Sequence, residues 1–185
     1  LGEQQSGHIK EIGIELYQEM LEETISELKN NNEKIVSKKW SPKISINLPV
    51  LIPEVYIEDI NIRMEIYRKL SNIKEESELE LMEIELIDRF GKFPKEIEIL
   101  LRVILIKIKC KNLNIETIKD NKNGFIIQFK DNIFNNSEGL IHYISQSEYV
   151  KLHPDEKLIF MNNKGLNILD FIDSKLEDLN VINVN

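Results

Sequence analysis

The sequence predicts an α+β fold, with several helices packed on a small β-sheet and a long linking helix in front of them. Apolar residues recur at helical spacing through most of the first 112 residues. Short alternating apolar runs, bounded by turn residues, follow from residue 115 onward. Because these strands are expected to pair mainly with their neighbours along the chain, the pattern favours an α+β domain over a doubly wound sheet.

The linking helix is predicted over residues 8–31. Its apolar residues lie close to helical spacing: Ile9, Ile12, Leu16, Met20 and Leu28. A polar connector then runs to Pro42, which we interpret as a domain boundary. We therefore expect a linking segment over residues 1–41 and the α+β domain over residues 42–185.

The domain is expected to open with a strand over residues 44–48 and a short turn of helix at Pro53. Asp59 can cap a helix that ends near Asn72.

An acidic helix should follow, since Ser77 and Glu80 have the spacing of a capping box. Gly91 suits its end, because glycine tolerates the backbone conformation that closes a helix.

Pro94 suits the first turn of the next helix, predicted to reach about Asn112. Ile104, Ile106 and Ile108 alternate partly with charged residues, as in a strand, but the length and the absence of breakers favour a helix.

The last third of the chain mixes short strands with two helices. Residues 115–119 and 125–129 are predicted to form a hairpin with its turn at Asn123–Gly124. The remaining elements are a helix over 137–147, strands over 149–152 and 157–161, and a final amphipathic helix over 166–179.

The charge of the chain excludes one class of function. The net charge is −8, and residues 1–100 carry all of it, with 21 acidic and 13 basic residues. Without a basic patch, the chain is not expected to bind nucleic acid by itself.

One cysteine permits no internal disulfide, and no signal peptide or membrane-spanning run occurs, so we expect a cytoplasmic protein. The start at Leu1, within an apparent loop, indicates a piece of a longer protein.

No catalytic, cofactor-binding or metal-binding residue is predicted. The sequence lacks the glycine-rich motifs that bind phosphates and the motif that presents a nucleophilic serine. The three histidines are far apart in sequence and lack the spacing of metal ligands. Cys110 sits in an apolar helix without a neighbouring base, so we expect an unreactive thiol. An independent hydrolase built on paired carboxylates remains a less favoured alternative.

The acidic helix has two distinct faces at 100° per residue. Leu79, Met82, Leu86 and Phe90 form the stripe expected to face the core. On the opposite side lie Leu81, Ile84, Glu85 and Asp88. This mixed surface suits a basic, partly apolar partner. Alternatively, another part of the same domain covers Leu81 and Ile84.

Two stretches resemble known families. The opening Leu1-Gly2-Glu3-Gln4-Gln5-Ser6-Gly7-His8-Ile9 is similar to the end of the translocation motif of RecG-type DNA translocases. Residues 59–94, with Asn61, Arg63, Tyr67 and the run Glu85-Leu86-Ile87-Asp88-Arg89-Phe90-Gly91, resemble the C-terminal domain of the bacterial transcription-repair coupling factors (Mfd). After about Asn121 only the pattern of elements is similar, and we assign no functional residue there.

The resemblance implies a parent protein that translocates on double-stranded DNA at the expense of ATP, displaces stalled RNA polymerase and recruits excision repair through UvrA. This domain would not be the motor and would have no ATPase activity alone. It would dock on a UvrB-like N-terminal domain of the parent and mask the UvrA-binding surface. Glu85 and Asp88 would occupy acidic positions of that contact, and Gln5 would belong to the translocation motif. The remaining alternative is a structural support for the motor lobe.

Overall fold

The computed structural model describes residues 40–184, which divide into two compact units. Unit 1 contains Trp40 and Asn47–Leu105, and unit 2 contains Ser41–Ile46 and the chain from Ile106 onward. Helix α5 (Lys95–Asn112) runs from one unit into the other. The helix predicted over residues 8–31 and the predicted motif residue Gln5 lie outside the described residues.

In unit 1, α3 (Ile60–Asn72) and α4 (Glu76–Phe90) precede α5. The predicted cap of α3 is confirmed, because Asp59 Oδ1 accepts a hydrogen bond from the Asn61 N–H at 2.7 Å. The turn expected at Pro53 is also present, with the Pro53 carbonyl accepting from the N–H groups of Tyr56 and Ile57.

The predicted start of α4 was wrong by two residues. The capping box does not join Ser77 and Glu80, because the helix already begins at Glu76. The carboxylate of Glu78 instead accepts from the N–H of Lys74 at 2.7 Å and from that of Glu75 at 3.3 Å. These backbone bonds lower the pKa of Glu78, as expected for a carboxylate at the positive end of a helix. In a run this rich in glutamate, several residues can serve as the cap.

The predicted break between α4 and α5 is confirmed. The Gly91 N–H donates to the Ile87 carbonyl, and Gly91 has φ +81° and ψ −159°, a region that essentially only glycine adopts. The Pro94 carbonyl then accepts the first bonds of α5, from Ile97 and Glu98. The run that alternates like a strand is helical, as its length indicated.

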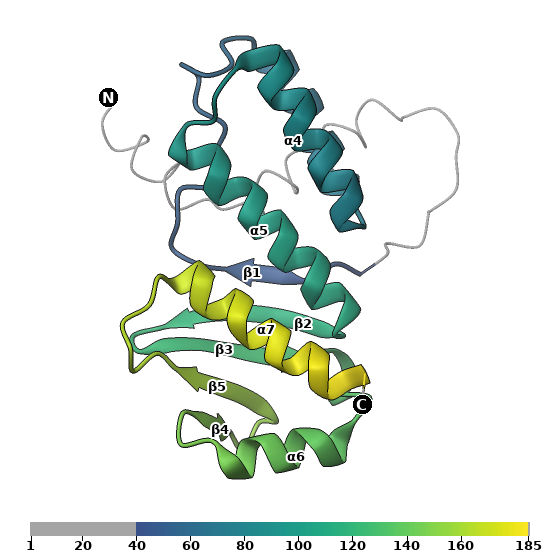
Figure 1. Ribbon diagram of the computed structural model, residues 1–185, viewed down its shortest axis with the longest axis vertical. Coiled ribbons are helices and arrows are strands. Elements are labelled where there is room, and N and C mark those ends of the chain that lie inside the picture. Colours follow the sequence, from purple (N-terminus) through teal and green to yellow (C-terminus); the bar gives the residue numbers. More distant parts are fainter. Residues whose placement is uncertain (1–39, 185) are drawn as a thin grey trace. The chain divides into compact units, whose positions relative to one another are not determined.

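Unit 2 contains a five-stranded sheet with the strand order β1-β2-β3-β5-β4 (Figure 1). The strands are β1 (Lys43–Ser45), β2 (Ile115–Asn121), β3 (Gly124–Phe129), β4 (Val150–Leu152) and β5 (Lys157–Met161). All neighbours pair antiparallel except β1, which runs parallel to β2. The α+β prediction is confirmed, and β1 is shorter than the strand expected over residues 44–48.

The β2–β3 hairpin turns one residue earlier than predicted. Asn121 pairs with Gly124, so the loop is Lys122–Asn123 and Gly124 is the first residue of β3. Gly124 has φ +152°, and a Cβ atom there would lie 1.9 Å from the Phe160 carbonyl oxygen on β5. Glycine is therefore favoured here both by its backbone conformation after the loop and by the close approach of β5.

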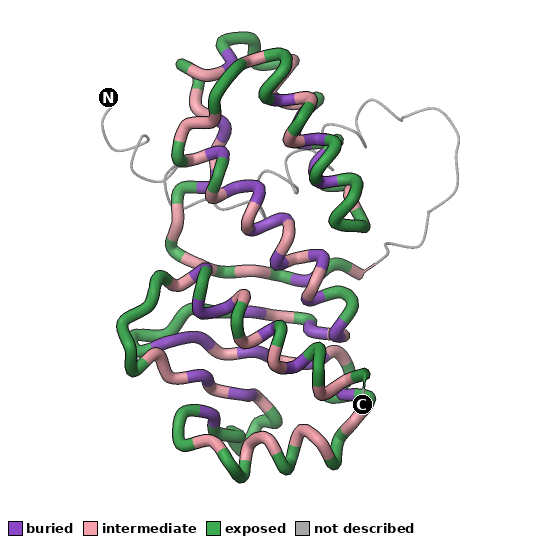
Figure 2. The backbone as a smooth tube through the Cα atoms, in the orientation of Figure 1, coloured by how far each residue is buried: buried purple, intermediate pink, exposed green. Residues whose placement is uncertain are grey.

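Three helical segments complete unit 2: the short 3₁₀ segment η1 (Lys130–Asn132), α6 (Ser137–Gln146) and α7 (Ile168–Val184), which runs five residues beyond its predicted end. Helix α7 packs on the sheet through Phe171, whose ring meets Phe125 edge-on with centroids 5.3 Å apart. Phe125 also stacks on Phe160 at 4.8 Å. The Lys109 ammonium joins α5 to α7 by pairing with Asp173 at 2.6 Å. Buried residues accordingly line the sheet and the facing sides of the helices (Figure 2).

Candidate functional site

The core side of α4 is confirmed as predicted. Leu79, Met82 and Leu86 are buried, and the half-buried Phe90 packs against the ring of Tyr56 with centroids 5.9 Å apart. This side anchors the helix in unit 1.

The outward side carries large apolar side chains. Leu81 is 68% exposed, Ile84 is 63% exposed and Ile87, which the sequence interpretation left out, is 51% exposed. Asp88 lies one helical turn from Ile84 and is also exposed. We call Leu81, Ile84, Ile87 and Asp88 the outer face of α4. Their exposure argues against the alternative that another part of the domain covers Leu81 and Ile84.

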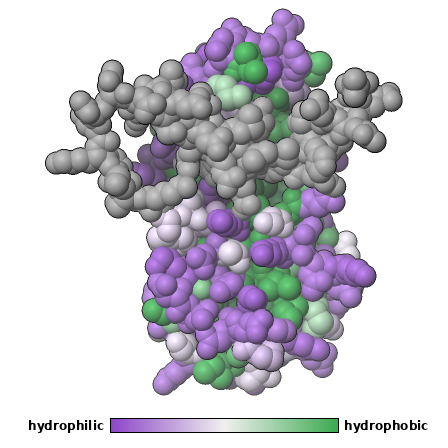
Figure 3. Space-filling model, turned by 180° about the vertical axis from the view of Figure 1, so that it is seen from behind, coloured by the Kyte–Doolittle hydropathy of each residue, from purple (hydrophilic) through white to green (hydrophobic). Residues whose placement is uncertain are grey.

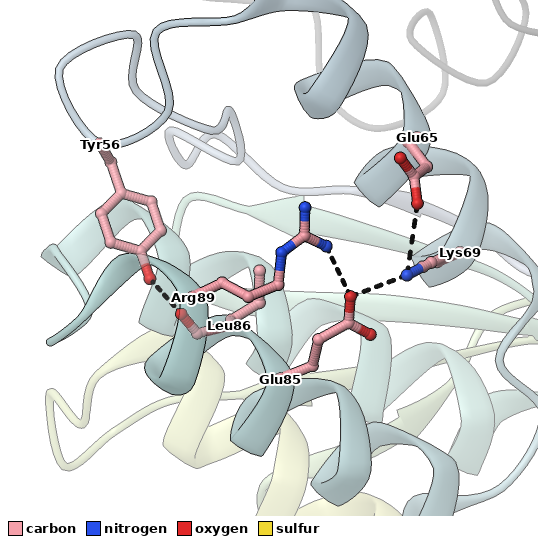
Figure 4. A network of polar contacts seen from close by, with 6 residues as sticks. All are labelled: Tyr56, Glu65, Lys69, Glu85, Leu86 and Arg89. Atoms are coloured by element: carbon pink, nitrogen blue, oxygen red, sulfur yellow. Dashed lines mark hydrogen bonds and ion pairs between the residues drawn. The ribbon is translucent and has the colours of Figure 1, made fainter.

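Glu85 is already occupied by partners within unit 1 (Figure 4). Its Oε1 accepts from Lys69 Nζ on α3 and from Arg89 Nη1 one turn along α4, each at 2.7 Å. The hydrogen bond with Lys69, followed by that with Arg89, lowers the pKa of Glu85. Lys69 also reaches Glu65 at 3.4 Å. Glu85 therefore joins α3 to α4, and its negative charge is paired with Lys69 and Arg89.

Asp88 differs from Glu85 in this respect. In the described part of the chain, no hydrogen bond or ion pair involves its carboxylate. The sequence predicted both acids as contact residues, but the structure gives them different surroundings. Of the two, Asp88 has its charge available to a partner.

Residues outside α4 fix its C-terminal end. The Tyr56 hydroxyl lies within hydrogen-bonding distance of the carbonyls of Leu86 at 3.3 Å and Gly91 at 3.2 Å. The Arg89 guanidinium lies over the Phe90 ring, 4.9 Å from its centroid. Burial raises the pKa of Tyr56. Sequence reasoning missed both Tyr56 and Lys69, because only the folded chain brings them to α4.

The other candidate residues do not form a reaction centre among residues 40–184. His142 and His153 are exposed, and Cys110 is fully buried with the pKa of its thiol raised by burial. No group of three His, Cys, Asp or Glu side chains there is placed to hold a metal ion. Burial, followed by the charge of Glu80, raises the pKa of Glu83. No helix within these residues is long and apolar enough to span a membrane.

Comparisons with known proteins agree on one family. The family model described as TRCF domain matches residues 46–140. The chain is 42% identical over 162 residues to the transcription-repair-coupling factor of Rickettsia conorii and 32% identical over 166 residues to that of Escherichia coli. These alignments cover 87% and 88% of this chain but 14% of each relative.

One solved structure shares the fold. It is described as a crystal structure of the C-terminal domain of transcription-repair coupling factor, and it matches with a TM-score of 0.66 at 23% identity. The match covers 81% of this chain and 98% of the other. The chain thus spans about one-seventh of the length of the curated relatives and nearly the whole of a similarly folded domain.

Proposed function

The chain belongs to the TRCF domain family of transcription-repair-coupling factors, and on that premise we propose that it is the C-terminal regulatory domain of such a factor. In this proposal the outer face of α4 docks on a UvrB-like domain of the same protein. The docked domain masks the surface that UvrA would bind and restrains the motor. The interdomain contact is released when the parent protein engages RNA polymerase.

The motor activity belongs to the rest of the parent protein in this proposal. The parent would translocate on double-stranded DNA with ATP in the cytoplasm and displace stalled polymerase. This chain would hold neither the nucleotide nor the DNA. The chain would instead regulate the parent protein through the strength of one interdomain contact.

The observation that carries the proposal is the outer face of α4, where exposed apolar side chains accompany the Asp88 carboxylate, which makes no hydrogen bond or ion pair within residues 40–184. Fully burying a leucine or isoleucine side chain stabilises a contact by about 1.5–3 kcal/mol. Leu81 and Ile84 are each more than 60% exposed, so most of that gain is still available to a partner. Asp88 adds charge complementarity with a basic surface, which supplies specificity and sensitivity to salt. A contact of this size can be both formed and released.

In this proposal the two acids have different roles. Glu85 would hold α4 beside α3 through Lys69, whereas Asp88 would touch the partner. Loss of Glu85 should therefore weaken docking indirectly, and loss of Asp88 should weaken it directly.

The test uses the full-length factor with the double substitution Leu81→Ser and Asp88→Lys. We expect tighter UvrA binding and a higher basal ATPase rate, because the masked surface opens. The matched control is Glu54→Lys with Val55→Ser, which changes an exposed acid and a 92% exposed valine elsewhere in unit 1. If the outer-face variant stays folded but keeps wild-type UvrA binding and ATPase rate, the docking role is wrong. That result would favour the alternative, in which the domain is a structural support for the motor lobe.

A binding titration of this chain against the isolated UvrB-like domain addresses the contact itself. Affinity should fall as salt is raised, since screening weakens the Asp88 contribution. The Asp88→Asn variant should show a shallower salt dependence than the wild type. An unchanged slope would place the contact elsewhere on the domain.

A further inference from the structure

Among residues 40–184, helices pack against one face of the sheet of unit 2 and none packs against the other face. Along β3, Phe125, Ile127 and Phe129 are buried, and α7 packs against this side through Phe171. Ile126 and Gln128 alternate with them and stay half-exposed on the opposite side. The same alternation recurs in β5, where Leu158 and Phe160 are buried and their neighbours are half-exposed.

The strand register places the residues of this side in rows across the sheet, since directly paired residues share a face, and two of these rows carry lysines. The first row is Ser45–Lys119–Ile126–Ile159–Lys151, on β1, β2, β3, β5 and β4. The second row is Lys43–Thr117–Gln128–Lys157, on β1, β2, β3 and β5. In each row two lysines flank a pair of uncharged residues, and in the first row Ser45 lies beyond Lys119. We call these nine residues the lysine-flanked sheet face.

The charge on this face is largely unneutralised. Lys43, Lys119 and Lys151 are exposed, and within residues 40–184 none of them takes part in an ion pair. Lys157 is the exception, because Asp155 lies 3.5 Å from its ammonium and also 3.5 Å from His153 Nδ1. Neither row contains an acidic residue. Viewed from behind, the lower part of the molecule shows hydrophobic surface bordered by hydrophilic surface (Figure 3).

We propose that the lysine-flanked sheet face binds an acidic amphipathic helix of a partner protein. Neighbouring strands lie about 4.8 Å apart, so the Lys119 and Lys151 backbones are separated by about three spacings, or ~14 Å. An α-helix with its side chains is ~10–12 Å wide. A helix lying along β3 and β5 therefore places its apolar stripe on Ile126 and Ile159. Glutamates on both flanks of that stripe then reach the lysines.

The chemistry of the face favours such a helix over single-stranded nucleic acid. Sheet faces that bind single strands offer aromatic side chains on which bases stack. The two rows contain no aromatic residue and have aliphatic and amide side chains at their centre. The inference does not rest on the outer face of α4, which belongs to the other unit.

The test measures fluorescence anisotropy of a labelled synthetic helix of about 18 residues, whose leucine stripe is flanked by glutamates. We expect the wild-type chain to bind it and Lys119→Glu with Lys151→Glu to weaken binding at least about tenfold. The matched control, Lys92→Glu with Lys95→Glu, makes the same change of charge at exposed lysines of unit 1 and should change the affinity less than about twofold.

One further protein variant and one further peptide separate the contribution of charge to binding from that of apolar contact. Ile126→Thr with Ile159→Thr keeps β-branched residues in the strands and should also weaken binding, while a peptide with lysine in place of glutamate should not bind. Circular dichroism establishes that each variant is folded. Failure of the wild-type chain to bind the acidic helix, an equal loss in the control variant, or preferential binding of oligothymidine would each overturn the proposal.

Discussion

Replacement of Glu85 by glutamine tests whether this acid stabilises unit 1 more than it serves a partner. The substitution keeps the size of the side chain and removes the charge that faces Lys69 and Arg89. Its matched control is Asp88→Asn, three residues along the same helix, where no ion pair is broken in the described part of the chain.

The expected loss follows from two partly exposed ion pairs. The Arg89–Glu85 pair is an i,i+4 helix pair, and such pairs contribute about 0.3–0.5 kcal/mol. The Lys69–Glu85 pair joins two helices at 2.7 Å with side chains 41% and 34% exposed, and such pairs contribute about 0.2–1 kcal/mol. Together they predict a loss of about 1 kcal/mol for Glu85→Gln, or a Tm lower by roughly 2–4 °C. Asp88→Asn should change stability by less than about 0.5 kcal/mol.

Urea unfolding followed by circular dichroism measures the free energy of unfolding of the wild type and of both variants. The pKa of Glu85 is lowered in the folded chain, so its contribution is complete above the unfolded pKa of about 4.3 and is lost as pH falls through the folded value. The difference between wild type and Glu85→Gln should therefore be constant near neutral pH and shrink below about pH 4. Equal effects of Glu85→Gln and Asp88→Asn, or a difference independent of pH in acid, would refute the assignment of Glu85 to the α3–α4 contact.

Three further substitutions or reactions probe other features. Gly124→Ala should cost at least about 3 kcal/mol in urea unfolding, because its Cβ would overlap the Phe160 carbonyl; a mild effect would contradict the tight β3–β5 contact. Gly91→Ala should cost only about 1–3 kcal/mol of backbone strain, since nothing lies within 4 Å of the added Cβ; a loss as large as that of Gly124→Ala would contradict this distinction. The Cys110 thiol should react with iodoacetamide only at the rate of unfolding, because it is buried and its pKa is raised; rapid alkylation of the native chain would exclude that burial.

Local signals in the sequence predicted most of the helices and strands. Asp59, Gly91 and Pro94 act within a few residues of themselves, and the structure places each at the boundary that its chemistry favours. Where several residues could play one part, as among the glutamates at the start of α4, the sequence did not single out Glu78. The error at the hairpin has a similar origin, because the sequence does not show that Gly124 also lies against the backbone of a neighbouring strand.

The sequence was sufficient to predict which side of α4 is exposed. It was not sufficient to predict which acidic residue on that helix is paired. Helical periodicity separates Leu81 and Ile84 from the core residues of α4 without any knowledge of the fold. The pairing of Glu85 with Lys69 depends on how α3 packs beside α4, which periodicity does not contain. The lysine-flanked sheet face depends even more on the fold, because its rows exist only once the register of five strands is known.

The short strand β1 has a consequence for how the chain folds. Residues Ser41–Ile46 belong to unit 2, yet Trp40 before them and Asn47 after them belong to unit 1, so unit 2 is not a continuous stretch of sequence. The β2–β3 and β4–β5 hairpins close short loops and can form early, whereas β1 must await a distant parallel partner, a slow type of pairing. Until it arrives, the outer edge of β2 presents unpaired backbone groups to any other strand. A shortened chain that begins at Ile106 would keep that edge permanently open and should self-associate, and a peptide spanning residues 41–46 should suppress this by supplying the missing strand.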